Sequence, residues 1–183
     1  SSHIKSKLFD IYSNNFNNNH RYVLGKLGKN PLCIFGVNPS KADEYQYDLT
    51  MRKIEKFSVI NNFNGYMMFN ICSIRCTDPE KLPQRYSKEF FVENLKVIHN
   101  LVEKVDNPVI WGAWGGTISK RSYLFNHLHQ IYTSLEVFRP QWVQCGNLTY
   151  QGHPRHPSRL SYKKIFSPLK MKEYLSTHIK QVS

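Results

Sequence analysis

The sequence predicts an α/β fold: a three-layer α/β/α sandwich around a central, mostly parallel sheet of four to five strands. Apolar runs of strand length alternate with helix-like segments. The run at 32–37 (LCIFGV) is almost entirely apolar, as expected for a strand buried on both faces. A chain of 183 residues, 40% of them hydrophobic, suits one domain with a single core. We therefore expect residues 1–183 to form one domain, with a polar N-terminal arm at 1–20.

The individual elements follow from local patterns. The apolar residues at 91, 95, 98, 102 and 105 repeat with helical 4-3-4-3 spacing, and Ser87 is placed to cap that helix. Gly28-Lys29-Asn30-Pro31 is a turn that closes the first predicted strand. Strands are expected at 21–27, 32–37, 66–69, 109–111, 135–138 and 142–145. Helices are expected at 50–57, 87–105, 119–132 and about 168–179, and residues 7–12 are expected to be either part of the arm or a short helix.

The charge balance favours a polyanionic partner. Lys and Arg number 25 against 13 acidic residues, which gives a net charge of +12. Such an excess attracts phosphate backbones, although a basic protein without a nucleic-acid partner would show it too. No apolar run approaches the roughly 18 residues of a membrane helix. The four cysteines lack C-x-x-C spacing, and the N-terminus lacks a signal-peptide pattern. We expect no metal, no cofactor, no membrane association and a cytoplasmic location.

Three predicted strands run directly into polar or glycine-bearing segments. These segments are Gly36-Val37-Asn38-Pro39-Ser40, Asn70, and 112–116. Ligands of parallel sheets bind outside the carboxyl ends of the strands, so the three segments are expected to share one site. Each alone has a plain alternative, because Asn-Pro-Ser is a common turn and Asn70 could simply end a strand. Their order along the chain is what favours a shared site.

Four motifs in this order resemble those of the uracil-DNA glycosylase superfamily. Gly36-Val37-Asn38-Pro39-Ser40 resembles the first motif, in the form found in mismatch-specific and thymine-DNA glycosylases. The segments 67–70 (MMFN) and 109–113 (VIWGA) resemble the second and third strand motifs. His156-Pro157-Ser158-Arg159-Leu160-Ser161 is similar to the closing His-Pro-Ser-Pro-Leu-Ser motif and shares five of its six residue types.

The chain also resembles an uncharacterised bacterial and phage domain family of unknown function, over nearly its whole length. This second resemblance indicates the fold more than the activity. It rests on Arg21-Tyr22, Asn38-Pro39-Ser40 with Ala42-Asp43, Asp48 with Thr50, Asn70, Trp111-Gly112 and His156-Pro157.

The glycosylase resemblance implies an enzyme that flips uracil or a related pyrimidine out of DNA and hydrolyses its N-glycosidic bond. His156 would stabilise the departing base anion, and the Asn70 amide would pair with the Watson–Crick edge of the base. Asn38 falls at the position of the water-orienting residue. Leu160 would fill the gap left by the flipped base. The groups expected to contact DNA phosphates beside it are Arg155, Ser158, Arg159 and Lys163.

The departures from these motifs widen the substrate range. The uracil-specific enzymes carry Asp at the position of Asn38, so Asp43 or Asp48 would have to substitute as the base. They also carry Tyr at the position of Ser40, and the smaller residue leaves room near C5 of a pyrimidine. Uracil, mismatched thymine and C5-modified pyrimidines all remain as substrates. Val37 and Tyr47 complete the expected base-binding set, Tyr47 as a stacking ring for which Tyr45 is an alternative.

Two other functions stay open. A glycosylase-like fold could bind nucleic acid without cleaving it, and the replacement of Asp by Asn38 favours this alternative. An enzyme acting on free nucleosides or nucleotides would not need such a basic surface. The expected partner is DNA, single- or double-stranded. The resemblance also implies a monomer and, as a further partner, a proteinaceous glycosylase inhibitor.

Overall fold

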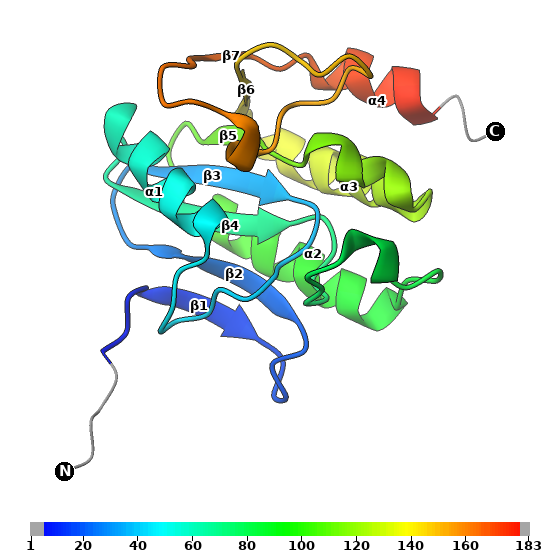
Figure 1. Ribbon diagram of the computed structural model, residues 1–183, viewed down its shortest axis with the longest axis horizontal. Coiled ribbons are helices and arrows are strands. Elements are labelled where there is room, and N and C mark those ends of the chain that lie inside the picture. The colour runs from blue at the N-terminus through cyan, green and yellow to red at the C-terminus, as the bar shows by residue number, and fades with distance from the viewer. Residues whose placement is uncertain (1–5, 180–183) are drawn as a thin grey trace.

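The computed structural model describes residues 6–179, and within them a seven-stranded sheet forms the centre of the molecule (Figure 1). Its strand order is β1-β2-β4-β3-β5-β6-β7. The strands are β1 (Ile11–Asn14), β2 (Arg21–Lys26), β3 (Pro31–Gly36), β4 (Gly65–Asn70), β5 (Val109–Gly112), β6 (Gln141–Cys145) and β7 (Phe166–Pro168).

The α/β class is confirmed, but the predicted sheet of four to five mostly parallel strands is wrong. The central strands β4, β3, β5 and β6 are parallel to their neighbours. The outer pairs β1–β2, β2–β4 and β6–β7 are antiparallel, which makes the seven-stranded sheet mixed. The extra strands are short and lie at the edges, where pairing depends on contacts distant in sequence rather than on a long apolar run.

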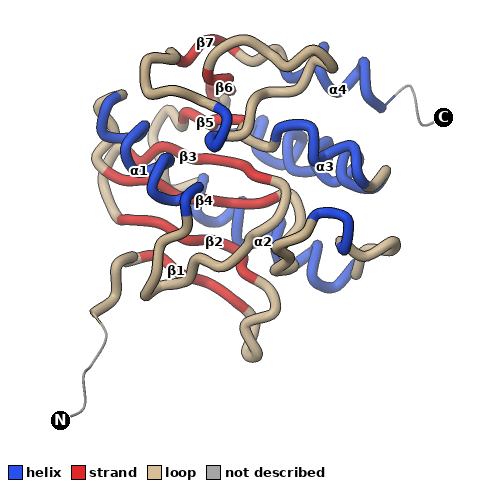
Figure 2. The backbone as a smooth tube through the Cα atoms, viewed as in Figure 1, coloured by secondary structure: helices blue, strands red, loops and turns tan. Residues whose placement is uncertain are grey.

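Helices cover both faces of the sheet (Figure 2). Helix α1 (Leu49–Ile60) lies in front of the sheet, and α2 (Lys88–Val102) and α3 (Tyr123–Leu135) lie behind it (Figure 1). Helix α4 (Met171–Ile179) packs beside α3. No helix in the described part of the chain is long and apolar enough to cross a membrane.

Strand side chains alternate between two apolar cores, as the period of two in a strand requires. In β3, Cys33 and Phe35 pack with residues of α2, α3 and α4 on one face. Leu32 and Ile34 pack with residues of α1 on the other face. A strand that is apolar on both sides is the pattern that the sequence shows at 32–37, and β3 lies in the middle of the sheet accordingly.

Two local predictions are wrong, and the start of one predicted helix is shifted. Residues 7–12 do not form a helix, because Ile11–Asn14 is a strand that pairs antiparallel with β2. Residues 135–138 do not form a strand, because the last turn of α3 continues into a 3₁₀ turn at Glu136–Phe138. The predicted C-terminal helix is present, but it begins at Met171 rather than near residue 168, because Phe166–Pro168 pairs with β6 as β7.

The register of the central strands brings their carboxyl ends together. Gly36 at the end of β3 lies beside Asn70 at the end of β4. The chain after each strand stays hydrogen-bonded to its neighbour: the Ile71 amide donates to the Gly36 carbonyl at 2.9 Å, and the Ala113 amide donates to the Phe35 carbonyl at 2.9 Å. The loops that follow β3, β4 and β5 therefore border one region.

Candidate functional site

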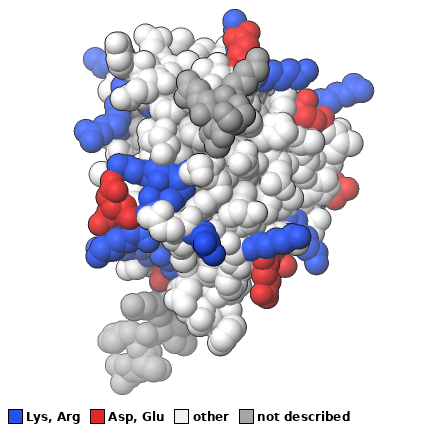
Figure 3. Space-filling model, turned by 90° about the vertical axis from the view of Figure 1, so that its right-hand side faces the viewer, with Lys and Arg blue, Asp and Glu red and all other residues white. Residues whose placement is uncertain are grey.

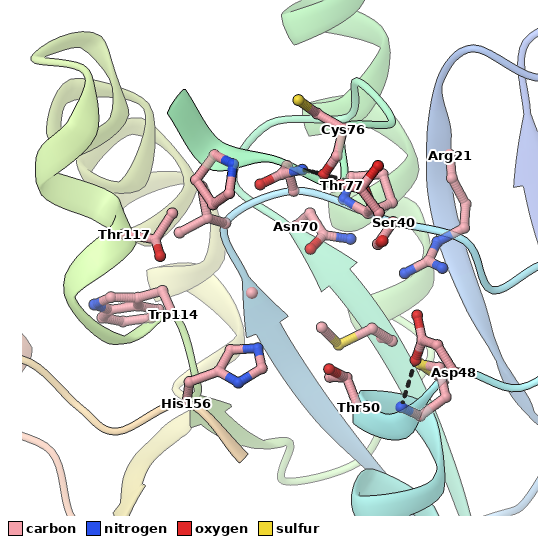
Figure 4. Close-up of a pocket in the computed structure, with 17 residues that line it drawn as sticks. Arg21, Ser40, Asp48, Thr50, Asn70, Cys76, Thr77, Trp114, Thr117 and His156 are labelled. Carbon is pink, nitrogen blue, oxygen red and sulfur yellow. Dashed lines mark hydrogen bonds between the residues drawn. The ribbon is translucent and has the colours of Figure 1, made fainter. Parts of the chain in front are cut away.

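A polar pocket of about 240 Å³ lies at the carboxyl ends of the parallel strands (Figure 4). At about 30 Å³ of liquid volume per water, it has room for roughly eight waters, a size that suits a single heterocyclic ring. Six predicted site residues line it, four of them at the strand ends and the other two, Asp48 and His156, in loops. They are Val37, Asn38, Ser40, Asp48, Asn70 and His156.

The Asn70 side chain is buried in this pocket without a hydrogen-bond partner. The residue is only 1% exposed, and neither its Oδ1 nor its Nδ2 bonds to any described residue. Its backbone is held from behind, because Asn94 Nδ2 of α2 donates to the Asn70 carbonyl at 2.9 Å. An amide left unpaired in a buried position costs free energy, so its donor and acceptor are available for a ligand.

A glycine opposite Asn70 keeps this space open. A Cβ atom on Gly36 would lie 2.9 Å from Asn70 Oδ1 and 2.8 Å from Met68 Cε. Contacts this short force a neighbour to move. Gly36 is therefore explained by the volume that the amide needs, and not by an unusual backbone angle.

His156 is held so that one ring nitrogen faces the pocket as a donor. The backbone amide of Ser158 donates to His156 Nδ1 at 3.2 Å, and Ser158 Oγ lies 2.8 Å from the same nitrogen. Since an amide N–H can only donate, Nδ1 is the acceptor, and the neutral ring carries its proton on Nε2. Burial lowers the pKa of His156, an effect that Asp48 opposes and Arg159 reinforces. The ring points into the pocket (Figure 4).

Gly115 fixes the backbone that carries His156. Its φ of +60° is in the left-handed region that favours glycine, and a Cβ there would lie 3.2 Å from His156 Cβ. Its amide donates to the Pro154 carbonyl at 2.9 Å. The loop after β5 and the segment before His156 are thus tied together.

Asp48 and Asn38, which were expected to activate or orient the attacking water, have different hydrogen-bond partners. Asp48 is the N-cap of α1, and its Oδ1 accepts from the Met51 amide at 2.9 Å while the side chain lines the pocket. Asn38 uses Nδ2 for the chain itself, donating to the carbonyls of Cys76 at 2.7 Å and Pro39 at 3.1 Å. The carboxylate that reaches the pocket is therefore Asp48, and Asn38 offers only its amide oxygen.

Arg21, the first residue of β2, was missed as a site residue by sequence reasoning. It is 2% exposed and lines the pocket, where Figure 4 shows its guanidinium turned inward. Burial, and then the nearby Arg75, lower the pKa of Arg21 to about 10, so it is still cationic at neutral pH. Its appearance in the Arg21-Tyr22 match was the one available signal, because nothing in the local pattern marks an arginine as buried.

The Trp114 ring borders the pocket and is anchored by a chain of hydrogen bonds. Trp114 Nε1 donates to the Tyr174 hydroxyl at 2.9 Å. That hydroxyl lies 2.7 Å from His153 Nδ1, and His153 Nε2 lies 3.2 Å from Ser119 Oγ. The Tyr174 hydroxyl therefore accepts from the indole and pairs with the imidazole of His153. His153 is thereby held in a structural hydrogen-bond chain and does not line the pocket.

An open groove of about 770 Å³ continues from His156 and carries basic side chains. Lys120, Arg155, Ser158 and Arg159 line it, so three of the four predicted phosphate contacts border this groove. Lys120 is paired with Glu80. On the face that Figure 3 presents, Lys and Arg side chains lie in several separate groups, with acidic side chains beside some of them. The positive charge in the groove itself therefore comes mainly from Arg155 and Arg159.

Four predicted site residues line neither the pocket nor the groove. Tyr47 donates its hydroxyl to Glu55 at 2.7 Å and packs its ring on Phe9. Asp43 accepts from the Tyr45 amide at 2.9 Å in a tight turn. Leu160 is 2% exposed in the core beneath α1, so its placement contradicts a wedge exposed to DNA. Lys163 is exposed but lies outside both the pocket and the groove.

The placements of Tyr47 and Leu160 have a common physical reason. Apolar and aromatic side chains near the pocket are drawn into the core or against α1, whichever buries more surface. The Tyr47 hydroxyl donates to Glu55 and its ring packs on Phe9, and Leu160 packs in the core beneath α1.

Within residues 6–179 no group of three or more His, Cys, Asp or Glu side chains could hold a metal ion.

The fold and the pocket define an α/β protein with a small polar site at the carboxyl ends of parallel strands, a usual place for a ligand in such sheets. The chain belongs to a family of proteins of unknown function (DUF1643), whose pattern matches residues 21–158. Membership in a family of unknown function agrees with the second resemblance found in the sequence. Searches of curated proteins and of solved structures return no match to the chain.

Proposed function

We propose that this protein is a DNA glycosylase that flips uracil or a related pyrimidine into the pocket and hydrolyses its N-glycosidic bond. The single observation that carries the proposal is the unpartnered Asn70 amide, 1% exposed, in a pocket that also holds the His156 ring. An amide presents one donor and one acceptor, which matches the N3–H and O4 edge of uracil. The pocket volume of about 240 Å³ suits one such ring.

His156 has the protonation that the chemistry needs. As the C1′–N1 bond breaks, its electron pair moves into the base, and negative charge develops on O2. A neutral imidazole with its proton on Nε2 can donate to that oxygen, and a donor aimed at developing charge is the largest single catalytic term in many enzymes. The lowered pKa of His156 keeps the ring neutral, so the group that donates to O2 is an imidazole and not an imidazolium.

Asp48 is the proposed acceptor for the proton of the attacking water. The water oxygen forms the new bond to C1′, its proton passes to the Asp48 carboxylate, and the departing base later takes up a proton from solvent. Asn38 Oδ1 would orient the same water, since its Nδ2 is committed to the Cys76 and Pro39 carbonyls. Arg155 and Arg159 in the adjoining groove would contact phosphates of the strand that carries the flipped nucleotide.

The test is incubation with single-stranded and duplex oligonucleotides that contain one uracil, one mismatched thymine or one C5-modified pyrimidine, followed by alkaline cleavage at abasic sites. We expect strand cleavage with at least one of these bases. His156→Ala should lower the rate by about 100- to 1000-fold, the usual effect of removing one oxyanion donor. No abasic product from any base would refute the proposal.

Asp48→Asn separates the catalytic role of Asp48 from its capping role. Asn is as good an N-cap as Asp, so the variant should keep its thermal stability within a few tenths of a kcal/mol. It should nevertheless lose most of its cleavage activity, because an amide cannot accept the water proton. Asp43→Asn is the matched control, since Asp43 lies outside the pocket. Equal activity of the two variants would remove Asp48 from the mechanism.

A second candidate function is nucleic-acid binding without cleavage. The observation that favours it is the Asn38 side chain, which replaces a carboxylate and bonds to the chain through Nδ2. This alternative predicts salt-dependent DNA binding, weakened by Arg159→Gln, with no abasic product. The oligonucleotide panel distinguishes the two functions directly.

A further inference from the structure

Arg21 carries a positive charge that the described part of the chain does not pair. The residue is 2% exposed, and its one hydrogen bond is from Nη1 to the Ala42 carbonyl at 3.0 Å. Its Nε is buried with no partner. No carboxylate of residues 6–179 lies within 4.0 Å of the guanidinium, although Asp48 and Asp43 act on it at longer range. A buried, unpaired charge is costly, which points to an anion from outside.

A second arginine strengthens the positive potential on the same side of the pocket. Arg75 Nη1 donates to the Ser40 carbonyl at 2.6 Å, and its Nη2 donates to the Tyr12 hydroxyl at 2.8 Å. Arg21 and Arg75 thus both hold the loop that carries Ser40, through carbonyls at residues 42 and 40. Carbonyl oxygens satisfy hydrogen bonds but cancel no net charge, so the two cations remain under-compensated.

The order of the side chains around the pocket determines which edge of a bound pyrimidine would face the Arg21 guanidinium. In Figure 4, Asn70 lies between His156 on one side and Ser40 and Arg21 on the other. Around a pyrimidine ring the sequence is O2, N3, O4 and C5. With O2 at His156 and the N3–O4 edge at Asn70, the next position, C5, faces Ser40 and Arg21. Ser40 is small enough to leave a C5 substituent in reach of the guanidinium.

We infer that the pocket selects a pyrimidine whose C5 substituent is an anion, a carboxylate, paired with Arg21. This inference rests on the proposed function, because it uses the base orientation that His156 and Asn70 define. Arg21 is then a specificity-determining residue, with two parallel N–H groups suited to a carboxylate. Asp48 opposes the anion weakly, since its Oδ1 is engaged by the Met51 amide at the α1 N-terminus.

The test measures binding of free bases to the wild-type protein by calorimetry. The probes are 5-carboxyuracil, its neutral isostere 5-carbamoyluracil, 5-methyluracil and inorganic phosphate. We expect 5-carboxyuracil to bind about tenfold or more tightly than either neutral base, the worth of a charge-assisted hydrogen bond. Equal affinities would overturn the inference. The inference would also be overturned if inorganic phosphate competes with 5-carboxyuracil for the protein while 5-carboxyuracil binds no more tightly than 5-carbamoyluracil.

Variants locate the effect. Arg21→Gln should abolish the preference for the carboxylate, whereas Arg52→Gln should keep it, because Arg52 is an exposed arginine of α1 outside the pocket. If Arg21→Gln does not fold, the comparison of carboxylate and carbamoyl bases on the wild-type protein still decides the question. Cleavage of uracil DNA without carboxylate preference would remove only this inference. Carboxylate preference without cleavage of any oligonucleotide would remove only the proposed catalysis.

Discussion

The space beside Asn70 is tested most sharply by Gly36→Ala. The new Cβ would lie 2.9 Å from Asn70 Oδ1 and 2.8 Å from Met68 Cε, both shorter than ordinary van der Waals contact. The Met68 methyl group is the end of a flexible side chain and can move aside. The amide of Asn70 must rotate, because β3 and β4 are paired throughout and hold both backbones in register.

The expected cost follows from these contacts. Overpacking a core by one methyl group costs about 1–3 kcal/mol, and the gain from stiffening the unfolded chain offsets about 0.4–1 kcal/mol of it. A net loss of about 1–2 kcal/mol lowers the melting temperature of a chain of this size by roughly 2–8 °C. Displacement of the amide should also weaken pyrimidine binding by about tenfold or more, since small misplacements in a site have large effects.

The assay is calorimetric melting combined with NMR of the Asn70 side-chain amide. Gly116→Ala is the matched control for stability, because nothing lies within 4 Å of its built Cβ, and it should melt within about 2 °C of the wild-type protein. If Gly36→Ala melts like Gly116→Ala and leaves the Asn70 resonances unshifted, the steric explanation of Gly36 is wrong.

Three further predictions concern His127, Tyr174 and His156. Burial lowers the pKa of His127 to about 4, so between about pH 6.5 and pH 4 the unfolded chain binds a proton that the folded chain does not, and the free energy of unfolding falls as the pH is lowered through this range. His127→Phe should reduce this loss of stability by about 2 kcal/mol, measured by urea denaturation at pH 7 and at pH 4.5. The same loss in the variant and the wild-type protein would contradict the prediction. Tyr174→Phe leaves Trp114 Nε1 and His153 Nδ1 unpaired and should cost about 1–3 kcal/mol in thermal unfolding, with the fully exposed Tyr150→Phe as a silent control. For His156, NMR should show a pKa below 6.5 and the proton on Nε2, and a proton on Nδ1 would refute the assigned tautomer.

The parts of the fold that the sequence predicts are those set by local patterns. The apolar run at 32–37 is found as the central strand β3, and the helix after Ser87 begins at Lys88. The edge strands β1 and β7 are four and three residues long, and nothing local distinguishes them from loops. Their formation depends on β2 and β6, partners that only the folded chain brings near.

The candidate site divides in the same way. Asn38 and Asn70 were predicted because polar residues at the ends of parallel strands meet at one edge of the sheet, whereas His156 was predicted from the resemblance of residues 156–161 to a glycosylase motif; all three line the pocket. Leu160 was misplaced because a leucine in a loop carries no sign of whether it faces solvent or core. Arg21 was missed because its burial results from β2 pairing antiparallel with β4, which brings the start of β2 to the pocket edge.

The measurement that tests the proposed function most directly is abasic-site formation in a single-stranded oligonucleotide carrying one uracil or one C5-carboxylated uracil. The wild-type protein should release the base in repeated turnovers, and His156→Ala should be slower by about 100- to 1000-fold while still binding the oligonucleotide. A wild-type protein that binds the oligonucleotide and leaves both bases attached would contradict the assignment of this pocket to base excision.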